Sequence, residues 1–345
     1  MTSRAREFVA AVPRALDGVR VDRAVAMLTG VSRAEAAALV AAGQVSVDGR
    51  AMRSRSAPLV AGGELVVELP SGRPALEPEA TVPFRVVYED PGFVVVDKPA
   101  GVVVHPGAGR RDGTLVAGLL ARYPDIAGLC GVCDPTRPGI VHRIDRSTSG
   151  LLVVARTAGA YRSLAAQMAA RSAGRRYLAL VLGHLEDERG VIDAPIGRSV
   201  RTPTKMSVSS AGRPARTGYE VLQRLDEVTG PHGAVALPAT LVSCRLETGR
   251  THQIRVHFAA IGHPVLGDDR YGRLPTGVLA PGRLFLHAAE LAIDHPESAQ
   301  RMSWSSPLPD DLVSVLGGRD ADPAAAGPAT AGSQRPIDDG AGSGA

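Results

Sequence analysis

The segment His142–Gly150, HRIDRSTSG, sets one acidic residue among arginines. Asp145 lies between Arg143 and Arg146, and the apolar run LLVVA follows directly. This pattern predicts a carboxylate at a turn that leads into a buried strand. A carboxylate that is paired with an arginine stays ionised at neutral pH, so it can act as a nucleophile or a base without a metal ion.

Two residues elsewhere in the chain could meet Asp145. Tyr177 lies in RRYLALVLG, which predicts a strand, and Arg255 lies about one turn into the predicted helix RTHQIRVHFAAIG. A structural Asp–Arg ion pair and a tyrosine packed in the core would explain the same residues, and ion pairs are more common than active sites. The residues by themselves leave both interpretations open.

Two other patterns fall short of a catalytic or cofactor motif. HPGAGRRDG has glycines spaced G-x-G-x-x-x-G, one residue longer than the dinucleotide-binding fingerprint. His142, Asp145 and Ser147 are the residue types of a catalytic triad, but they lie within six positions, whereas a triad gathers its members from separate elements. We therefore expect neither a dinucleotide site nor a triad.

The cysteines and histidines do not predict a metal site. Cys130 and Cys133 form a single C-x-x-C and Cys244 lies alone in a predicted strand, so a four-ligand zinc set is incomplete. His252 and His257 would point about 140° apart on a helix, too far apart to bind one ion together. We expect no metal and no organic cofactor.

Shifts in composition divide the 345 residues into segments. The stretch LPSGRPALEPEATVP holds four prolines and predicts a linker. The C-terminal stretch is dominated by Ala, Gly, Pro and Asp and cannot bury a core. The expected segments are a flexible arm at 1–17, a small domain at 18–70, the linker at 71–83, a large domain at 84–318 and a disordered tail at 319–345.

The small domain carries strong local signals. Ser32 and Glu35 have the spacing of a helix capping box, Gly43 is a favourable helix stop, and VRVDRAVAML predicts a helix before them. Asp48 and Gly49 in QVSVDGRAM predict a hairpin, and GGELVVEL predicts a further strand.

This pattern resembles the RNA-binding domain of the ribosomal-protein-S-four type. The residues that carry the resemblance are SRAEAAALVAAGQVSVDGR and, more weakly, VAGGELVVEL. The resemblance implies that Arg33 and Arg50 face RNA phosphates. The alternative is a solvated small domain whose arginines give only solubility.

The large domain mixes strand patterns with helices. Strands are predicted by FRVVYED, GFVVVDKPAGVVVHPG, LLVVART, RRYLALVLG, ATLVSCRLETG and RLFLHAAELAIDHP. TAGAYRSLAAQMAARS places an apolar stripe at i, i+3, i+4 and i+7, which predicts a core-facing helix. Because helices interrupt the strands irregularly, the expected fold class is α+β, with a mixed, mainly antiparallel sheet in the large domain and a small α/β RNA-binding domain.

Several long motifs in the large domain resemble one family. RPGIVHRIDRSTSGLLVVART is similar to the central motif of the pseudouridine synthases of the large-ribosomal-subunit type, commonly written H-R-L-D-x-x-T-S-G. VVYEDPGFVVVDKPAGVVVHPGAGRRDGTLVAGLL resembles the segment before it, RRYLALVLG the tyrosine strand, LETGRTHQIRVHFAAIGHPVLGDDRYG the third motif, and RLFLHAAEL the last strand. The motifs cover nearly all of Val86–Leu308 in the family's order, so the chain is identified as a member.

The resemblance implies roles for the residues singled out above. Asp145 would be the catalytic aspartate, which attacks the anomeric carbon of a uridine or abstracts its 2′ proton. Arg143 matches the arginine that helps to flip the target base out of the stack. Tyr177 matches the ring that stacks on the uracil and that could accept the C5 proton, and Arg255 matches the arginine that pairs with the aspartate and orients it. The residues expected to shape the turn are His142, Thr148, Ser149 and Gly150.

A basic loop, RSVRTPTKMSVSSAGRPART, lies within the large domain. Its cationic residues stand among hydroxyl residues and glycines, a composition that suits contact with an RNA backbone. A solvated loop is the alternative. The residues expected to contact RNA are Arg201, Lys205, Arg213 and Arg216.

The expected function is isomerisation of uridine to pseudouridine in large-subunit ribosomal RNA or a pre-ribosomal particle, because the two-domain arrangement resembles that subgroup. A transfer-RNA pseudouridine synthase and a non-catalytic RNA-binding ribosome-assembly factor are the alternatives. The net charge of +4 suits a polyanionic partner. Apolar runs shorter than the ~20 residues of a membrane helix, three cysteines and the lack of a heptad pattern lead us to expect a cytoplasmic monomer that does not enter a membrane.

Overall fold

The computed structural model describes residues 6–29, 31, 33–69, 76–106, 112–202, 204–228, 237–272 and 282–317. Ser32 of the expected capping box and the tail expected at 319–345 lie outside the described residues.

The chain divides into two compact units, Met1–Leu76 and Glu77–Ala345, and the division lies within the linker expected at 71–83. The C-terminal part of that linker packs on the large unit, however. Val82 is buried, and the amide of Glu79 donates to the carbonyl of Ala117 over 3.0 Å. The expected linker is therefore too long at its C-terminal end.

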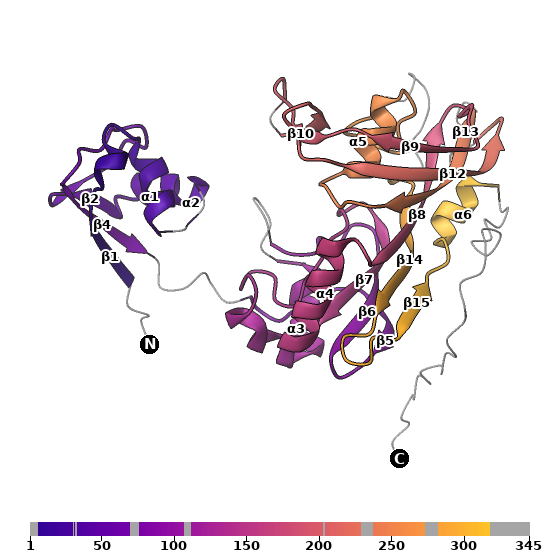
Figure 1. The fold of residues 1–345 in the computed structure, drawn as a ribbon, viewed down its shortest axis with the longest axis horizontal. Helices are drawn as coiled ribbons and strands as arrows, with labels where there is room; N and C mark the ends of the chain where they lie inside the picture. Colours follow the sequence, from indigo (N-terminus) through magenta and orange to yellow (C-terminus); the bar gives the residue numbers. More distant parts are fainter. Residues whose placement is uncertain are drawn as a thin grey trace, which may run out of the picture. The chain divides into compact units, whose positions relative to one another are not determined.

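The small unit packs two helices against a four-stranded sheet of order β1-β4-β2-β3 (Figure 1). The two predicted helices and the hairpin are confirmed. Asp48 and Gly49 have φ values of 48° and 74°, which a two-residue type I′ turn requires at both positions. The elements are β1 (Arg6–Ala11), a short 3₁₀ helix η1 (Arg14–Leu16), α1 (Val21–Thr29), α2 (Arg33–Ala41), β2 (Val45–Val47), β3 (Arg50–Ala51) and β4 (Glu64–Leu69).

The flexible arm expected at 1–17 is wrong for residues 6–17. β1 pairs with β4 along its whole length, from Arg6 opposite Leu69 to Ala11 opposite Glu64. Val12 and Leu16 then enter the core of the small unit. An edge strand is held through backbone hydrogen bonds, so it can form without the strong side-chain alternation that sequence patterns detect.

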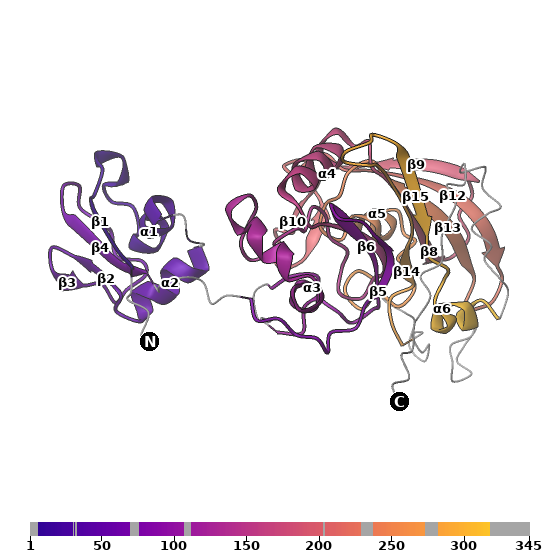
Figure 2. The same cartoon turned by 90° about the horizontal axis from the view of Figure 1, so that it is seen from below.

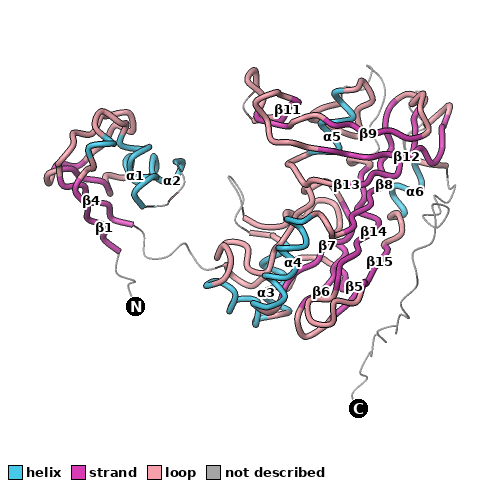
Figure 3. Tube along the Cα trace, in the orientation of Figure 1, coloured by secondary structure: helices cyan, strands magenta, loops and turns pink. Residues whose placement is uncertain are grey.

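The large unit is built on a nine-stranded sheet whose main order is β5-β6-β7-β14-β8-β13-β12-β9, with β15 pairing β14 (Figures 1 and 3). Among the described pairs, β7 with β14 is parallel and the others are antiparallel, so the expected fold class is confirmed. The strands are β5 (Arg85–Glu89), β6 (Phe93–Lys98), β7 (Ser149–Ala155), β8 (Gly174–Leu182), β9 (Arg189–Asp193), β12 (Arg216–Leu225), β13 (Ala239–Leu246), β14 (Leu286–Asp294) and β15 (Arg301–Ser305).

Helices cover the sheet in separate places (Figure 2). α4 contacts β7 and β14, whereas α5 contacts β12 and the separate hairpin β10–β11. Leu312 and Val315 of α6 join a core that includes Leu178 and Leu180 of β8. The remaining elements are α3 (Leu115–Arg122), 3₁₀ helix η2 (Pro124–Gly131), α4 (Ala158–Ala170), β10 (Ile196–Arg198), β11 (Met206–Val208), α5 (Gln253–Ala260) and α6 (Asp310–Val315).

Across the described part of the chain, no single helix has the length and apolarity to cross a membrane. Only α1 and α2 taken as a pair meet that test, and they are bent by 119°.

The strand that follows Asp145 approaches its neighbour unusually closely. Gly150 in β7 has a φ of 111°, and a Cβ placed on it would lie 2.3 Å from the carbonyl oxygen of Ala288 in β14. Only glycine fits this position, because both the backbone conformation and the space exclude a side chain. Gly150 thereby fixes the point where the parallel pair begins.

We predict that Gly150→Ala lowers the free energy of unfolding by more than about 2 kcal/mol, because the methyl group must displace β14. The matched control is Gly218→Ala in β12, where a Cβ would meet nothing within 4 Å. We expect that variant to stay within about 0.5 kcal/mol of wild type. Urea denaturation of both variants measures the difference, and equal stabilities would contradict the prediction.

Candidate active site

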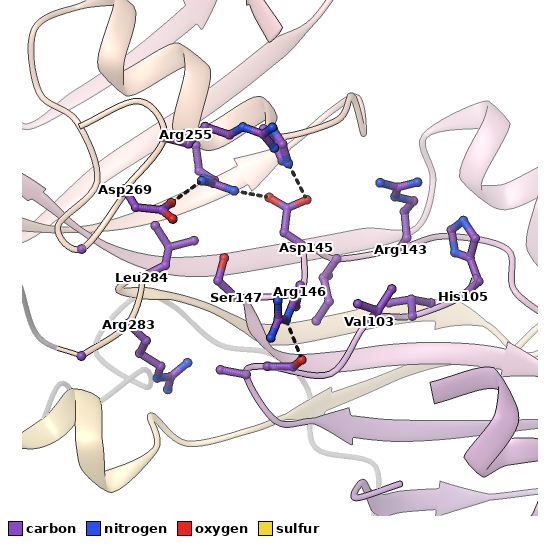
Figure 4. Close-up of a pocket in the computed structure, with 18 of the residues that line it drawn as sticks. Val103, His105, Arg143, Asp145, Arg146, Ser147, Arg255, Asp269, Arg283 and Leu284 are labelled. Atoms are coloured by element: carbon purple, nitrogen blue, oxygen red, sulfur yellow. Dashed lines mark hydrogen bonds and ion pairs between the residues drawn. The ribbon is translucent and has the colours of Figure 1, made fainter. Parts of the chain in front are cut away.

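Asp145 lies in the segment that leads into β7, and its side chain is 15% exposed. The amide of buried Thr148 donates to the Asp145 carbonyl over 3.1 Å, which closes the expected turn. Arg255, the third residue of α5, donates from Nη1 to Asp145 Oδ2 over 3.3 Å. These two residues are 110 positions apart in sequence, and the fold brings their side chains together (Figure 4).

Arg255 is fixed by a second, buried carboxylate, that of Asp268. Nε and Nη2 of Arg255 each donate to one Asp268 oxygen over 2.7 Å, which makes a bidentate pair. Asp268 Oδ1 also accepts from the amides of Arg270 and Tyr271. Burial opposes charge on both groups, but the pairing outweighs it, so the pKa of Arg255 is raised and the pKa of Asp268 is lowered. Arg255 therefore presents a fixed positive charge to Asp145.

His252 faces the other oxygen of Asp145. Its Nε2 lies 3.8 Å from Asp145 Oδ1, and its Nδ1 lies 2.7 Å from the Tyr271 hydroxyl. Burial lowers the pKa of His252, so the ring is neutral at pH 7. The residue caps α5 with a φ of 56°, a left-handed conformation that non-glycine residues rarely adopt and that is concentrated at functional sites.

Tyr177 of β8 lines a small cavity of about 50 Å³ that Asp145, Arg255 and Arg143 also line. The Tyr177 side chain is buried, and burial raises its pKa, so the hydroxyl keeps its proton at neutral pH. The structure thus brings Asp145, Arg255 and Tyr177 to one cavity.

Lys98, the last residue of β6, is fully buried and holds the turn through main-chain carbonyls. Its Nζ donates to the oxygens of Pro99, Val102 and Arg146 over 2.8, 2.9 and 3.3 Å. Burial lowers the pKa of Lys98 to about 7, although the charge of Asp145 opposes the shift. Because Arg146 is the residue after Asp145, Lys98 fixes the backbone that carries the carboxylate.

Two further residues expected to shape the turn are held by separate contacts. His142 Nε2 accepts from the amide of Val153 in β7 over 3.0 Å, and burial lowers its pKa to about 3. Ser149 Oγ accepts from Arg283 Nη1 over 3.0 Å and lies 2.9 Å from His287 Nδ1. The turn is therefore anchored both to its own strand and to β14.

Asp145 also lines a second, larger pocket. Its volume is about 1040 Å³, at the upper end of the range for small-molecule sites, roughly 300–1000 Å³. Arg143 is exposed at its wall, and Arg146, Arg283 and Lys205 also line it. Figure 4 shows Asp145 between Arg255 and Arg143. The pocket is thus large, open and surrounded by positive charge.

Three of the four residues expected to contact RNA from the basic loop lie on or against the hairpin β10–β11. Lys205 lines the large pocket, Arg201 is exposed in the connection between the two strands, and exposed Arg213 bonds through its backbone to Ile196 of β10. The loop placement is wrong for Arg216, which begins β12 and is ion-paired with Glu247 and Asp193. Its side chain holds neighbouring strands together, because each partner is an acidic residue near the same sheet.

The two arginines singled out in the small unit are both exposed. Arg33 begins α2, and its Nη2 lies 3.7 Å from Asp22 Oδ2. Arg50 follows the tight turn in the hairpin. Both side chains are open to solvent on their own unit.

Four residues that support the site had no role assigned from the sequence: Lys98, His252, Asp268 and Tyr271. The available signal for Lys98 was a lysine that ends an otherwise apolar run in GFVVVDK. The signal for Asp268 and Tyr271 was the polar cluster DDRY shortly after Arg255. Neither signal names its partner, because the contacts depend on the three-dimensional path of the chain.

Metal binding has no support among the residues that the structure describes, where no group of three His, Cys, Asp or Glu side chains could hold an ion. Cys244 is a free, buried thiol, and burial raises its pKa. The Sγ of Cys133 donates to the carbonyl of Leu129.

Asp145, Arg255 and Tyr177, which the sequence indicated as able to meet, line one cavity. Residues 92–260 match the family model described as RNA pseudouridylate synthase. Together with the relatives below, this match shows that the chain belongs to the RNA pseudouridine synthases, the enzymes that isomerise uridine in RNA.

Two bacterial relatives and one solved structure show which members of the family this chain resembles. The ribosomal large subunit pseudouridine synthase D of Nitrosomonas europaea is 42% identical over 315 residues, which span 88% of this chain and 86% of that protein. The protein of the same name from Pseudomonas aeruginosa is 42% identical over 319 residues, 89% of this chain and 94% of that one. The solved structure of human RNA pseudouridylate synthase domain containing 1 has 30% identity and a TM-score of 0.52, and covers 69% of this chain and 89% of that chain.

We predict that Asp268→Asn destabilises the protein by about 3 kcal/mol, because it leaves the buried Arg255 without its bidentate partner. Turnover should fall at least about tenfold as Arg255 loses its fixed position. The neighbouring Asp269→Asn is the matched control, since that side chain is 97% exposed and lies 3.8 Å from Arg255. Urea denaturation and a turnover assay measure both variants; similar losses in the two would contradict the prediction.

We predict that His142 makes stability depend on acidity. The folded pKa is about 3 and the unfolded value is about 6.5, so between them the unfolded chain binds the additional proton. The stabilisation is complete above about pH 6.5 and is lost as the pH falls toward 3, by up to about 1.4 kcal/mol per pH unit. His142→Gln keeps an acceptor for Val153 but does not titrate, so its unfolding free energy should fall less steeply between pH 7 and pH 5. Parallel slopes for the two proteins would count against this role.

Proposed function

We propose that the protein isomerises uridine to pseudouridine in large-subunit ribosomal RNA, with Asp145 as the catalytic aspartate. The observation that carries the proposal is the Asp145 carboxylate, held by Arg255 at the edge of a large open pocket and next to the buried ring of Tyr177. The names of the bacterial relatives, which are ribosomal large subunit pseudouridine synthases D, support the choice of RNA.

The chemistry asks for one carboxylate and no other reactive group. In one route, an Asp145 oxygen bonds to C1′ of the ribose while the C1′–N1 bond breaks and its electrons pass to the uracil. The freed ring turns, its C5 bonds to C1′ as the aspartate bond breaks, and the C5 proton passes to the released Asp145 carboxylate or to water while N1 takes up a proton. In the other route, Asp145 removes the 2′ proton and the uracil departs with the C1′–N1 electrons, which leaves a C1′–C2′ double bond; C5 then bonds to C1′ as Asp145 returns the proton to C2′, and the same exchange of the C5 and N1 protons follows. Both routes end with the same carbon–carbon bond.

Tyr177 is suited to hold the uracil ring. Its aromatic face lies in the cavity that Asp145 also lines. Because burial raises its pKa, the phenol keeps its own proton, which favours stacking over acceptance of the C5 proton. Arg143 is exposed at the wall of both cavities, where it could replace the target base in the RNA stack.

A cluster of arginines around the small cavity supports RNA binding at this rim. Arg250 lines the small cavity, and burial together with the charges of Arg213 and Arg171 lowers its pKa. Arg175 adds its positive charge near Tyr177. An arginine whose charged neighbours are also arginines is stabilised by phosphate, which makes the RNA backbone a fitting partner.

We also propose that the small unit binds structured RNA through Arg33 and Arg50. Both side chains are exposed, one at the start of α2 and the other in the hairpin. The proposal extends to a cytoplasmic monomer. Three cysteines in 345 residues favour a reducing compartment, and one chain supplies every group named in the pocket.

We predict that Asp145→Asn abolishes pseudouridine formation, because the neutral amide can neither attack C1′ nor remove a proton. Chemical mapping of pseudouridine across ribosomal and transfer RNA should be carried out in cells with the wild-type chain or the variant. Sites that vanish from large-subunit ribosomal RNA are the expected result. Loss confined to transfer RNA would overturn the proposed substrate.

The matched control is Asp269→Asn, whose carboxylate is exposed nearby. It should leave every site modified. If purified wild-type protein forms no pseudouridine on transcribed ribosomal RNA under single-turnover conditions, the proposed reaction on that RNA is wrong.

A further inference from the structure

A small satellite core joins the hairpin β10–β11 to the helix that carries Arg255. Its buried members are Ala215, Ile196 of β10 and Val256 of α5. Two partly buried residues, Met206 of β11 and Tyr271, pack against them. The hairpin is a separate two-stranded sheet, so this cluster is an important link between it and the catalytic elements. Because these side chains are packed together, a displacement of the hairpin would shift α5 and Tyr271 directly.

The Tyr271 hydroxyl connects this cluster to His252 by hydrogen bonds, and His252 faces Asp145. The amide of Met206 donates to the Tyr271 oxygen over 3.1 Å. The same oxygen lies 2.7 Å from Nδ1 of His252, which accepts the Tyr271 proton in one of the two tautomers of the neutral ring. In that tautomer the other nitrogen, Nε2, carries a hydrogen, and it faces Asp145 Oδ1 at 3.8 Å.

The ring of Tyr271 supports the second partner of Asp145 as well. The Arg255 guanidinium lies 5.2 Å from the ring centroid, within the range of a cation–π contact. The His252 ring meets the same ring edge-on at 5.5 Å. Arg255 and His252, the two groups that face Asp145, are thus both in contact with the Tyr271 ring.

The hairpin has a second attachment to the same short segment. Lys205, next to Met206, donates from Nζ to the carbonyl of Arg270 over 2.5 Å. The hairpin is therefore hydrogen-bonded to segment 268–271 at two neighbouring residues, Arg270 and Tyr271. Asp268, at the start of the same segment, is ion-paired with Arg255. Arg201 is exposed in the connection between β10 and β11, where a polyanion can reach it.

We propose that Tyr271 is a positioning residue that couples RNA contact at the hairpin β10–β11 to the orientation of the Asp145 carboxylate. Contact with the RNA backbone fixes the position of the hairpin. Through Met206 and Lys205, the hairpin fixes the position of Tyr271, and Tyr271 fixes the orientations of the His252 ring and the Arg255 guanidinium. The inference rests on the proposed RNA-modifying function and adds the way in which the substrate readies the site.

The first test is Tyr271→Phe, which keeps the ring and removes only the hydroxyl. With the full-length protein and saturating transcribed ribosomal RNA, we expect the single-turnover rate constant to fall about tenfold, while Kd for the RNA stays within about twofold. Tyr219→Phe is the matched control, because that tyrosine, in β12, packs on Phe258 of α5 and has no part in the relay. It should react at the wild-type rate.

The second test asks whether the hairpin acts through Tyr271. Arg201→Gln should slow the single-turnover step in the wild-type background and add little in the Tyr271→Phe background, since the relay is already broken. Effects that multiply independently would overturn the coupling. A rate for Tyr271→Phe equal to wild type would overturn the positioning role while leaving the reaction itself established.

A second variant keeps the test open if Tyr271→Phe does not fold. His252→Asn removes the imidazole, and asparagine tolerates the left-handed φ of 56° at this cap. We expect a similar loss of rate with an unchanged thermal midpoint and an unchanged Kd. A wild-type rate for this variant would overturn the relay. Absence of product from the wild-type protein would instead contradict the proposed function, so the two failures are distinguishable.

Discussion

The bidentate ion pair between Arg255 and Asp268 is the interaction on which the site depends. A guanidinium this deeply buried is stable only when carboxylates surround it. Asp268 satisfies two of its nitrogens, and the third is left to meet Asp145. The orientation of the Asp145 carboxylate is therefore set by an ion pair that lies beside the pocket and is protected from solvent.

Neutral and hydrogen-bonded groups hold the rest of the turn. His142 is kept uncharged by burial, Ser149 is bound to Arg283, and Lys98 is bound to three carbonyls. Such contacts fix the backbone on both sides of Asp145. Arg143 and Arg146, by contrast, are exposed where they line the large pocket, and their charge favours a polyanionic partner there.

The sequence predicted what depends on local chemistry. The Asp48-Gly49 turn, the helices of the small unit and the strand after Asp145 follow from residue types at short spacing. β1 was missed because backbone pairing with β4 forms it, and Arg216 was placed in a loop because its partners come from other strands. Asp268 could be seen as a carboxylate but not as the partner of Arg255, since only the fold brings the two residues together.

The position of β14 at the centre of the sheet bears on when the site comes into existence. β14 lies between β7, which follows Asp145, and β8, which carries Tyr177. β14 (Leu286–Asp294) is nevertheless one of the last strands to be synthesised. A nascent chain on the ribosome can form β5-β6-β7 and β8-β13-β12 as two separate halves, but only the late insertion of β14 joins them. Asp145 and Tyr177 are thus brought together only when synthesis of the folded body is nearly complete.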